Sequence, residues 1–152
     1  PVLAPGGLVF VNAYVEGDGD PEQDEILALD AESLQLRFRF GMGLLNISHA
    51  MAVVGDELYV CDKGNDRLQV FSLAGEHRRS IVGEWKQPHL LCFVKDRLYL
   101  VEERSYLLSN SQQGRLIWVL SLHGETLHTF TLPVAGHYIV SLQVFDGKLL
   151  AT

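Results

Sequence analysis

Two histidines forty residues apart are the side chains of this sequence best placed to do chemistry. His49 and His89 each open a short apolar segment, His49–Val54 and His89–Val94. If those segments are neighbouring strands around a common axis, both imidazoles point toward one central channel. Two or three imidazoles there could bind zinc and leave one coordination position open for water, as in a hydrolytic metal site. His137 is the candidate third ligand.

Two other groups of polar residues admit both a chemical and a structural interpretation. Asp62 and Arg67 bracket a turn, where they could act as an acid and an electrostatic clamp, or could fix the turn through amide hydrogen bonds and an ion pair. We favour the structural interpretation because an arginine, Arg115, recurs at the start of the corresponding later segment. The acidic segment 16–25 could be a calcium loop, but glycines interrupt its carboxylates and it lacks the ligand spacing of an EF-hand. We expect a solvated loop there.

A four-residue pattern that recurs along the chain indicates which elements position these residues. Leu58-Tyr59-Val60-Cys61 is repeated as Leu98-Tyr99-Leu100-Val101 and, more faintly, as Leu8-Val9-Phe10-Val11 and Leu149-Leu150-Ala151-Thr152. The patterns that begin at Leu8, Leu58 and Leu98 are each followed by a second apolar strand, at Ile26–Leu29, Leu68–Phe71 and Leu116–Val119 respectively. Self-similarity at a period of roughly 40–50 residues, with several strands in each unit, is typical of the blades of a β-propeller.

The second and third units each divide into four short strands joined by hairpin turns. The innermost strands are expected at His49–Val54, His89–Val94 and, in the last unit, Ile139–Phe145. The first unit is expected to lack its innermost strand and the last unit its outer two. The blade parts then fall at 7–43, 48–83, 88–133 and 138–152 within one domain, 1–152. The sequence therefore predicts an all-β fold, an incomplete β-propeller segment of about three and a quarter four-stranded antiparallel blades, without long helices.

The segment Leu58–Phe71 resembles the core of an NHL repeat, whose pattern runs apolar-Tyr-Val-Ala-Asp-x-Gly-Asn-x-Arg-Ile-x-Val-Phe. The glycine-bearing segments Phe40–Gly43 and Val82–Gly83 resemble the connectors between the blades of that family. The resemblance implies an NHL-type propeller, usually six-bladed, of which this chain is a part. Our interpretation of its function is a non-catalytic scaffold that binds a protein partner and needs no cofactor.

The segment His49–Phe71 also resembles peptidyl-hydroxyglycine amidating lyase, a zinc-dependent propeller enzyme. The resemblance implies that His49 is a metal ligand. The sequence departs from the family at Lys63, where the family carries a functional arginine, and at Val140, which occupies the position matching His89 in the last unit. A metal-dependent propeller lyase or hydrolase that holds zinc through the three histidines named above is therefore the alternative function.

The long connections of the chain fall in one topological class. If the strands of each blade alternate in direction, the loops between second and third strands share a face with the connectors between blades, opposite the tight turns. Long loops occupy Asn12–Glu25 and Glu102–Gly114. On this face we expect the partner-binding residues Trp85, Tyr106, Arg104, Asp18, Asp20 and Glu22. The acidic side chains favour a basic partner, and an exposed Trp85 would anchor it, although Trp85 could equally cap the gap between two blades.

Composition and charge limit the remaining classes of partner. The 152 residues carry a net charge of −7, and the only tight basic cluster is His77-Arg78-Arg79, so no nucleic acid is expected as a partner. No apolar run reaches the ~18 residues of a membrane-spanning helix, so no membrane is expected. Cys61 and Cys92 lie in apolar strand patterns typical of buried thiols. The cellular location stays open, with a slight preference for the cytoplasm.

The incomplete set of blades leaves two apolar blade faces open. Closure of a propeller ring covers such faces and the edges of the sheets. An open array needs caps or neighbours. We therefore expect further blades from missing sequence, or self-association.

Overall fold

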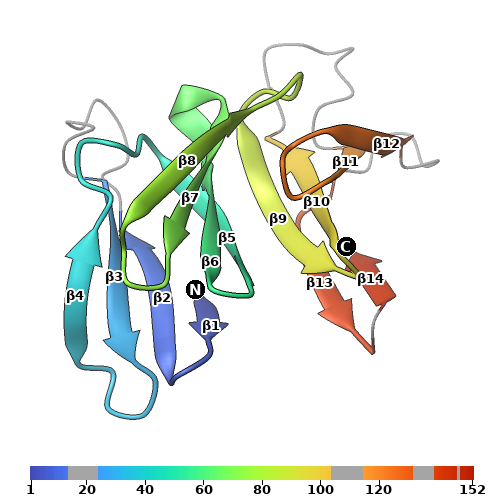
Figure 1. The fold of residues 1–152 in the computed structure, drawn as a ribbon. Coiled ribbons are helices and arrows are strands. Elements are labelled where there is room, and N and C mark those ends of the chain that lie inside the picture. The colour runs from blue at the N-terminus through green and yellow to red at the C-terminus, as the bar shows by residue number, and fades with distance from the viewer. Residues whose placement is uncertain (14–23, 104–114, 132–138, 147) are drawn as a thin grey trace.

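The computed structural model describes residues 1–13, 24–103, 115–131, 139–146 and 148–152. Within them the chain forms three four-stranded antiparallel sheets and one two-stranded sheet (Figure 1). The one helical element in this part of the chain is a short 3-10 turn, η2, at Lys63–Asn65. None of the described residues forms a helix that is long and apolar enough to cross a membrane. The predicted all-β arrangement of four-stranded antiparallel blades is confirmed.

The first sheet contains an innermost strand that the sequence pattern did not predict. Its strands, in order, are β1 (Val2–Ala4), β2 (Leu8–Ala13), β3 (Glu25–Asp30) and β4 (Leu36–Phe40). Val2 of β1 pairs with Phe10 of β2, and Ala4 pairs with Leu8. The first blade therefore begins at Val2 and is complete, rather than beginning at residue 7 without its inner strand. A three-residue strand is too short to show a period of two.

The second and third sheets contain the four strands predicted for each. They are β5 (Ser48–Val54), β6 (Glu57–Asp62), β7 (Arg67–Ser72) and β8 (His77–Val82), then β9 (Pro88–Val94), β10 (Arg97–Glu102), β11 (Leu116–Leu120) and β12 (Thr126–Thr131). The two-stranded sheet, which we call the half-blade, is β13 (Leu142–Phe145) and β14 (Lys148–Ala151). The first two predicted inner strands each begin one residue earlier than expected, and β13 begins at Leu142 rather than Ile139.

Backbone pairing shows which residues of different blades are equivalent. Tyr59 lies opposite Val70 in the second blade, as Tyr99 lies opposite Val119 in the third. Phe10, like Tyr59, is completely buried against the following blade. Phe10 therefore occupies the tyrosine position of the first blade, and the repeat Leu8-Val9-Phe10-Val11 aligned from the sequence is displaced by one residue. Such a displacement exchanges the two faces of a strand.

The core lies in layers between successive blades. Each blade has a leading face toward the preceding blade and a trailing face toward the following one. At the first junction, trailing residues Ala4, Phe10, Ile26 and Ala28 pack with leading residues Leu58, Val60 and Phe71. At the second, trailing residues Tyr59, Cys61, Leu68, Val70 and Ile81 pack with leading residues Leu91, Leu98, Leu100 and Leu120. At the third, Val101 and Ile117 pack with Ile139 and Leu142. Blades covered on both sides need apolar residues on both faces of each strand.

A glycine in the outer turn of two blades allows adjacent blades to approach closely. Gly75 lies between β7 and β8, and a Cβ there would be 2.9 Å from the ring of Phe40 in the preceding blade. Gly124 lies between β11 and β12, and a Cβ there would overlap Ile81. Both glycines have a positive φ, +87° and +90°, which L-residues rarely adopt. Phe40 and Ile81 are equivalent residues of the outermost strands, so the same contact closes both junctions.

The long connections leave the sheets at one end (Figure 1). β2 ends and β3 begins at this end, and the connection from β6 to β7 and the connectors from β4 to β5 and from β8 to β9 lie there. The turns within the hairpins β1–β2, β3–β4 and β5–β6 lie at the other end. We call the first end the connector face. This division follows from strands that alternate in direction outward from the axis.

Candidate functional site

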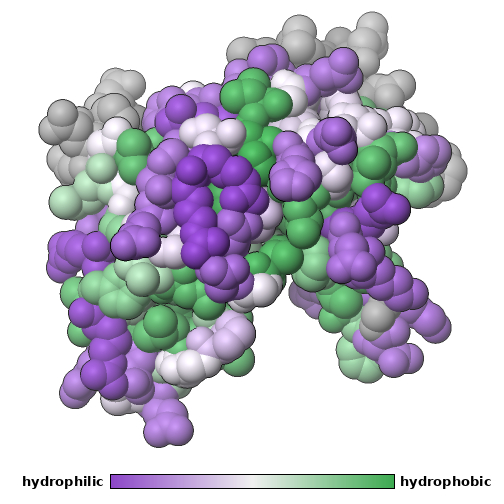
Figure 2. All heavy atoms as spheres, in the orientation of Figure 1, coloured by the Kyte–Doolittle hydropathy of each residue, from purple (hydrophilic) through white to green (hydrophobic). Residues whose placement is uncertain are grey.

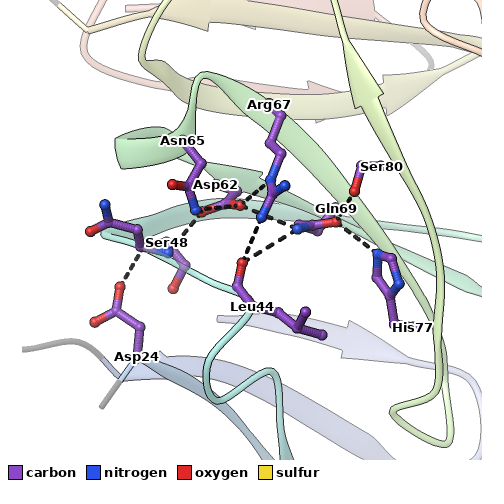
Figure 3. A network of polar contacts seen from close by, with 10 residues as sticks. Asp24, Leu44, Ser48, Asp62, Asn65, Arg67, Gln69, His77 and Ser80 are labelled. Atoms are coloured by element: carbon purple, nitrogen blue, oxygen red, sulfur yellow. Dashed lines mark hydrogen bonds and ion pairs between the residues drawn. The ribbon is translucent and has the colours of Figure 1, made fainter. Parts of the chain in front are cut away.

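Asp62, at the end of β6, is the centre of a polar network on the connector face (Figure 3). Its side chain is completely buried and accepts hydrogen bonds from the backbone N–H of Asn46 at 2.8 Å and from the side-chain amide of Asn65 at 3.0 Å. Arg67 Nε donates to the same carboxylate at 2.7 Å and forms an ion pair with it. A buried carboxylate is tolerated because such donors replace the water that it has lost.

Arg67 extends this network to the connector between the first and second blades. Its guanidinium donates to the carbonyl oxygen of Leu44 at 2.9 Å. Beside it, the side-chain amide of Gln69 lies 2.7 Å from Ser80 Oγ and 2.8 Å from His77 Nε2, so the polar contacts continue across β7 to β8 (Figure 3). The aspartate and the arginine that bracket the turn therefore hold a turn and a connector, which is the structural role favoured for them from the sequence.

Carboxylates also fix the connectors of the following blades through their backbone. Asp24 accepts a hydrogen bond from the N–H of Ser48 at 3.3 Å, and Asp66 accepts one from the N–H of Gln87 at 2.7 Å. The two aspartates stand at equivalent positions, just before the third strand of their blades. Each bond ties the residue before the third strand of one blade to the start of the next blade, which holds that connector in place.

Glu102 repeats in the third blade what Asp62 does in the second. It ends β10 and accepts a hydrogen bond from the backbone N–H of Lys86 at 2.7 Å. The side chain is buried, and burial raises the pKa of its carboxyl group above the ordinary value. Its part in the structure is therefore to accept a hydrogen bond from a connector. Keeping its carboxylate charged while buried costs free energy, because the group has lost water.

His49 and His89 lie side by side where β5 and β9 begin. Their rings stack with centroids 3.7 Å apart, and Nδ1 of His49 lies 3.0 Å from the carbonyl oxygen of His89. Glu103 Oε1 is 3.9 Å from Nδ1 of His89, and the Glu103 carboxylate also pairs with Lys63 Nζ at 2.8 Å. The structure thus brings together two residues that the sequence places forty positions apart.

Burial lowers the pKa of both imidazoles. The pKa of His89 falls to about 4, and the proximity of His49 adds to the effect of burial. The pKa of His49 is also lowered by burial, although the hydrogen bond that its ring makes to the backbone carbonyl oxygen of His89 acts in the opposite direction. Both rings are therefore uncharged near neutral pH. This is the form in which an imidazole coordinates a metal or accepts a hydrogen bond.

A hollow of about 500 Å³ lies beside His49 along the inner strands. Asn12 and His49 supply polar atoms to its lining, and Met51, Leu91 and Leu142 supply an apolar wall. A smaller hollow of about 280 Å³ shares these three apolar residues, so the two are parts of one channel along the inner strands. The channel could hold a ligand with an apolar body and a polar end that faces the histidine.

The donor set around the two histidines is small in the described part of the chain. No group of three or more histidine, cysteine, aspartate or glutamate side chains there is placed to hold a metal ion. Catalytic zinc takes three protein ligands and one water. Of the three histidines expected as zinc ligands, His49 and His89 are described and lie together, and His137 lies outside the described residues.

Trp85 is buried in the junction between the second and third blades. Its exposed fraction is 0%, and its ring packs edge-on against Trp118 with centroids 6.3 Å apart. A Cβ at Gly83 would overlap the Trp85 ring. Trp85 therefore has the other role considered for it and caps the gap between two blades, because no part of its ring is exposed for a partner.

The other predicted partner-binding residues lie outside the described residues. They fall in the two long loops and are Tyr106, Arg104, Asp18, Asp20 and Glu22. The structure fixes only the strand ends from which these loops leave, at Ala13, Glu25, Glu102 and Leu116.

The arginines of the basic cluster on β8 are engaged by carboxylates of the same blade. Arg78 pairs with Asp56 at 2.8 Å and with Glu57 at 3.2 Å, and Arg79 pairs with Glu57. Hydrogen bonds from Arg79 lower the pKa of Glu57 to about 2. The cluster is therefore a set of ion pairs along the blade and not an open basic patch.

Two exposed apolar side chains on the connector face were missed by reasoning from the sequence. Met42 is 57% exposed and Leu44 is 39% exposed. Both lie in the connector between β4 and β5, whose glycines Gly41 and Gly43 have positive φ. The available signal was a pair of apolar residues in a glycine-bearing segment that has no strand period.

Comparison with solved structures identifies the architecture. The chain matches Myxococcus xanthus glutaminyl cyclase with a TM-score of 0.64 and 17% identity, over 86% of this chain and 53% of that one. It matches BamB from Moraxella catarrhalis with a TM-score of 0.58 and 12% identity, over 84% and 34%. It matches the computationally designed Ika4 protein with a TM-score of 0.61 and 15% identity, over 95% and 78%. No protein-family model and no curated protein sequence matches the chain.

These matches show a fold. The three blades and the half-blade are a partial β-propeller, as the period of the sequence predicts. The chain spans about half of the glutaminyl cyclase and about a third of BamB. At such identities the shared architecture carries no statement about what this chain binds or converts.

Proposed function

We propose that this chain is part of an NHL-type β-propeller that acts as a non-catalytic scaffold and binds a protein partner on the connector face. The observation that carries the proposal is the pair of exposed apolar side chains, Met42 and Leu44, on a connector that Arg67 holds through the Leu44 carbonyl. Apolar side chains on a rigid support make good interface centres, because little conformational entropy is lost when they are buried.

The composition of the face around them also supports the proposal. Asn65, Glu84, Lys86 and Gln87 are exposed on the turns and connectors of the same face. An apolar centre with a polar rim is the usual composition of a protein–protein interface. The hydrogen bonds that fix the connectors would keep this surface in one shape before a partner arrives.

The two long loops belong to the same proposal. Asp18, Asp20 and Glu22 would attract a basic partner, at a rate that falls as salt concentration rises. Tyr106 and Arg104 would add anchor residues of the types that dominate binding energy in interfaces.

Photocrosslinking tests which face binds. A photoreactive amino acid at Met42 is expected to capture a protein from cell extract, and the matched control is the same probe at Leu34, exposed in the turn between β3 and β4. The captured protein, once purified, should bind Met42→Glu about tenfold or more weakly than the unchanged chain, and Leu34→Glu with unchanged affinity. Capture from Leu34, or from Gly55 and Gly75 at the turn end, but not from Met42, contradicts the proposal.

A second candidate function, a zinc-dependent lyase or hydrolase, is supported by the contact between His49 and His89. The test is the zinc content of the purified chain after equilibration with zinc, beside that of a double variant, His49→Ala and His89→Ala. A metal enzyme should bind zinc stoichiometrically and lose both zinc and activity in the variant. A scaffold should keep its partner in the same variant.

A further inference from the structure

The outermost strands β4, β8 and β12 end their sheets in the same way. Within the described residues each pairs with one strand alone, β3, β7 and β11 respectively. The inner strands β1, β5 and β9 contact one another, so the outer edges point away from the axis. Neighbouring blades cover the faces of a sheet and not its outer edge. The free edge of an outermost strand therefore does not depend on how many blades precede or follow it.

The three outer edges differ in charge. β4 carries Arg37 and Arg39, and β8 carries Arg78 and Arg79, whereas the six residues of β12, Thr126–Thr131, include no Asp, Glu, Lys or Arg. Figure 2 shows strongly hydrophilic residues over β8, and green and white residues among those over β12. Charged side chains are a common means of keeping a free edge from pairing with another strand. Of the three edges, β12 alone lacks this protection.

The bulge in each outermost strand makes the comparison residue by residue. All three strands have one extra residue at the same place, which is Arg37 in β4, Arg78 in β8 and Leu127 in β12. Two residues further on, Arg39 and Ser80 occupy the position of Thr129. The third blade therefore has uncharged residues at positions where one or both of the other blades have arginine.

We infer that β12 is an interface between two copies of this chain, whose β12 strands pair antiparallel about a two-fold axis. The free N–H and C=O groups of an edge have the spacing that binds another strand. A second copy is the occupant that the charges favour, because a symmetric pair brings each strand against its own side chains. Two β4 or two β8 strands would bring arginines together, and two β12 strands would not. The inference is independent of partner binding on the connector face.

The contact between His128 and Phe130 favours Thr129 as the centre of the pair. The two rings lie on the same face of β12 and meet edge-on, with centroids 4.5 Å apart. With the two-fold axis at Thr129, His128 of each copy lies opposite Phe130 of the other, and the four rings gather on one face of the joined sheet. Aromatic pairs across two strands stabilise a sheet. Thr129 then lies opposite its own counterpart.

This arrangement has consequences for the strength of the dimer and for its shape. A pair of six-residue strands buries less than the roughly 1,200 Å² of a stable interface, so the dimer should be weak and depend on concentration. Antiparallel pairing reverses one copy relative to the other. The connector faces of the two copies therefore point in opposite directions, and both stay open to a partner.

Cysteine crosslinking tests the pairing and its centre. Thr129→Cys would place two thiols on residues whose Cα atoms are about 4.5–5.5 Å apart, within the range of a disulfide. The matched control is Ser80→Cys, exposed at the equivalent position of β8, and the native Cys61 and Cys92 are buried. In a buffer with oxidised glutathione, Thr129→Cys should form a linked dimer of twice the 17.0 kDa mass about tenfold or more faster than Ser80→Cys.

Charge substitutions at the same residue test the interface without a crosslink. Thr129→Arg copies Arg39 of β4 and should weaken the dimer in sedimentation by about tenfold or more, because two like charges then lie opposite each other. An equimolar mixture of Thr129→Arg and Thr129→Glu pairs opposite charges and should recover the dimer. Ser80→Arg is the matched control and should leave the dimer unchanged.

Two results would overturn the inference. One is an unchanged chain that stays monomeric up to about 0.5 mM, since the edge would then have no useful affinity for a second copy. The other is a dimer that persists in Thr129→Arg while Thr129→Cys crosslinks no faster than Ser80→Cys, because its contact then lies elsewhere. Circular dichroism shows whether each variant keeps its sheets. Leu127→Arg, which copies Arg78, replaces Thr129→Arg if that variant does not fold.

Discussion

Asp66, in the loop of the second blade, accepts a hydrogen bond from the backbone N–H of Gln87 at 2.7 Å and so holds the start of the third blade. Asp24 does the same for Ser48 at the preceding junction. The equivalent position of the third blade is Arg115, because Ile117 pairs with Val101 as Leu68 pairs with Cys61. The alignment of Arg115 with Arg67 that the sequence suggested is therefore wrong by one residue. An arginine cannot accept a hydrogen bond from a backbone amide. The side chain at this position of the third blade therefore cannot repeat the contact that Asp24 and Asp66 make.

The first prediction concerns Asp62, the buried acceptor of the network around Arg67. Asp62→Ala should lower the free energy of unfolding by about 3 kcal/mol, because it leaves the Asn46 amide and Arg67 without their acceptor. Arg37→Ala removes an exposed ion pair with Asp30, which solvent screens, and should lower the free energy of unfolding far less. Urea denaturation of both variants measures the difference, and equal losses would show that the network adds nothing beyond a surface pair.

The second prediction concerns Trp85, whose ring fills the junction between two blades. Trp85→Ala should lower the free energy of unfolding by about 3–5 kcal/mol, since it leaves a large cavity. Trp85→Phe keeps most of the volume and should cost less. Thermal denaturation followed by circular dichroism ranks the variants. A Trp85→Ala chain with unchanged stability and weakened partner binding would restore the interpretation of this residue as an anchor.

The third prediction concerns the glycine contacts between blades. Gly55→Ala and Gly124→Ala both place a side chain at positive φ, which costs about 1 kcal/mol. The space around Gly55 is open, whereas the new Cβ of Gly124→Ala overlaps Ile81. Gly124→Ala should therefore lower the free energy of unfolding by a further ~1–3 kcal/mol. The comparison of the two melting temperatures isolates the contact, and identical shifts would mean that the junction can widen without strain.

The fourth prediction concerns pH. In the folded chain the pKa of His89 is about 4, below its ordinary value of 6.5. In the pH window between these two values the unfolded chain therefore binds a proton at this residue that the folded chain does not. The free energy of unfolding should therefore rise with pH through the window and fall as the solution is acidified. His89→Gln should flatten this dependence, while Lys63, Glu103 and His49 around it are unchanged. Urea midpoints measured across the window test it, and identical slopes would contradict the lowered pKa.

The second and third blades could be predicted strand by strand because their turns are marked. Gly55-Asp56 and Lys95-Asp96 separate the inner strands, and positive φ at Gly55, Lys95 and Asp96 is what such turns require. The contact of His49 with His89 was foreseeable in kind, since equivalent residues of neighbouring blades lie next to each other at the axis.

Registers and orientations could not be predicted in the same way. Apolar residues on both faces of β2 give no period of two, so the one-residue displacement at Phe10 left no trace in the sequence. A connector residue can point inward or outward, and nothing local distinguishes Trp85, which is buried, from Met42, which is exposed. That difference is set by the neighbouring blade, which the local sequence does not contain.

The glycine contacts have a consequence for how such a chain could grow by duplication. The segment Ser48–Val82 carries Gly75 for its contact with the preceding blade and Ile81 for its contact with the following one. A copy of this segment inserted in tandem would bring both halves of a junction with it, and each would meet its counterpart in the adjacent copy. Unequal recombination at the connectors could therefore lengthen or shorten the array in whole blades without new mutations at the joints.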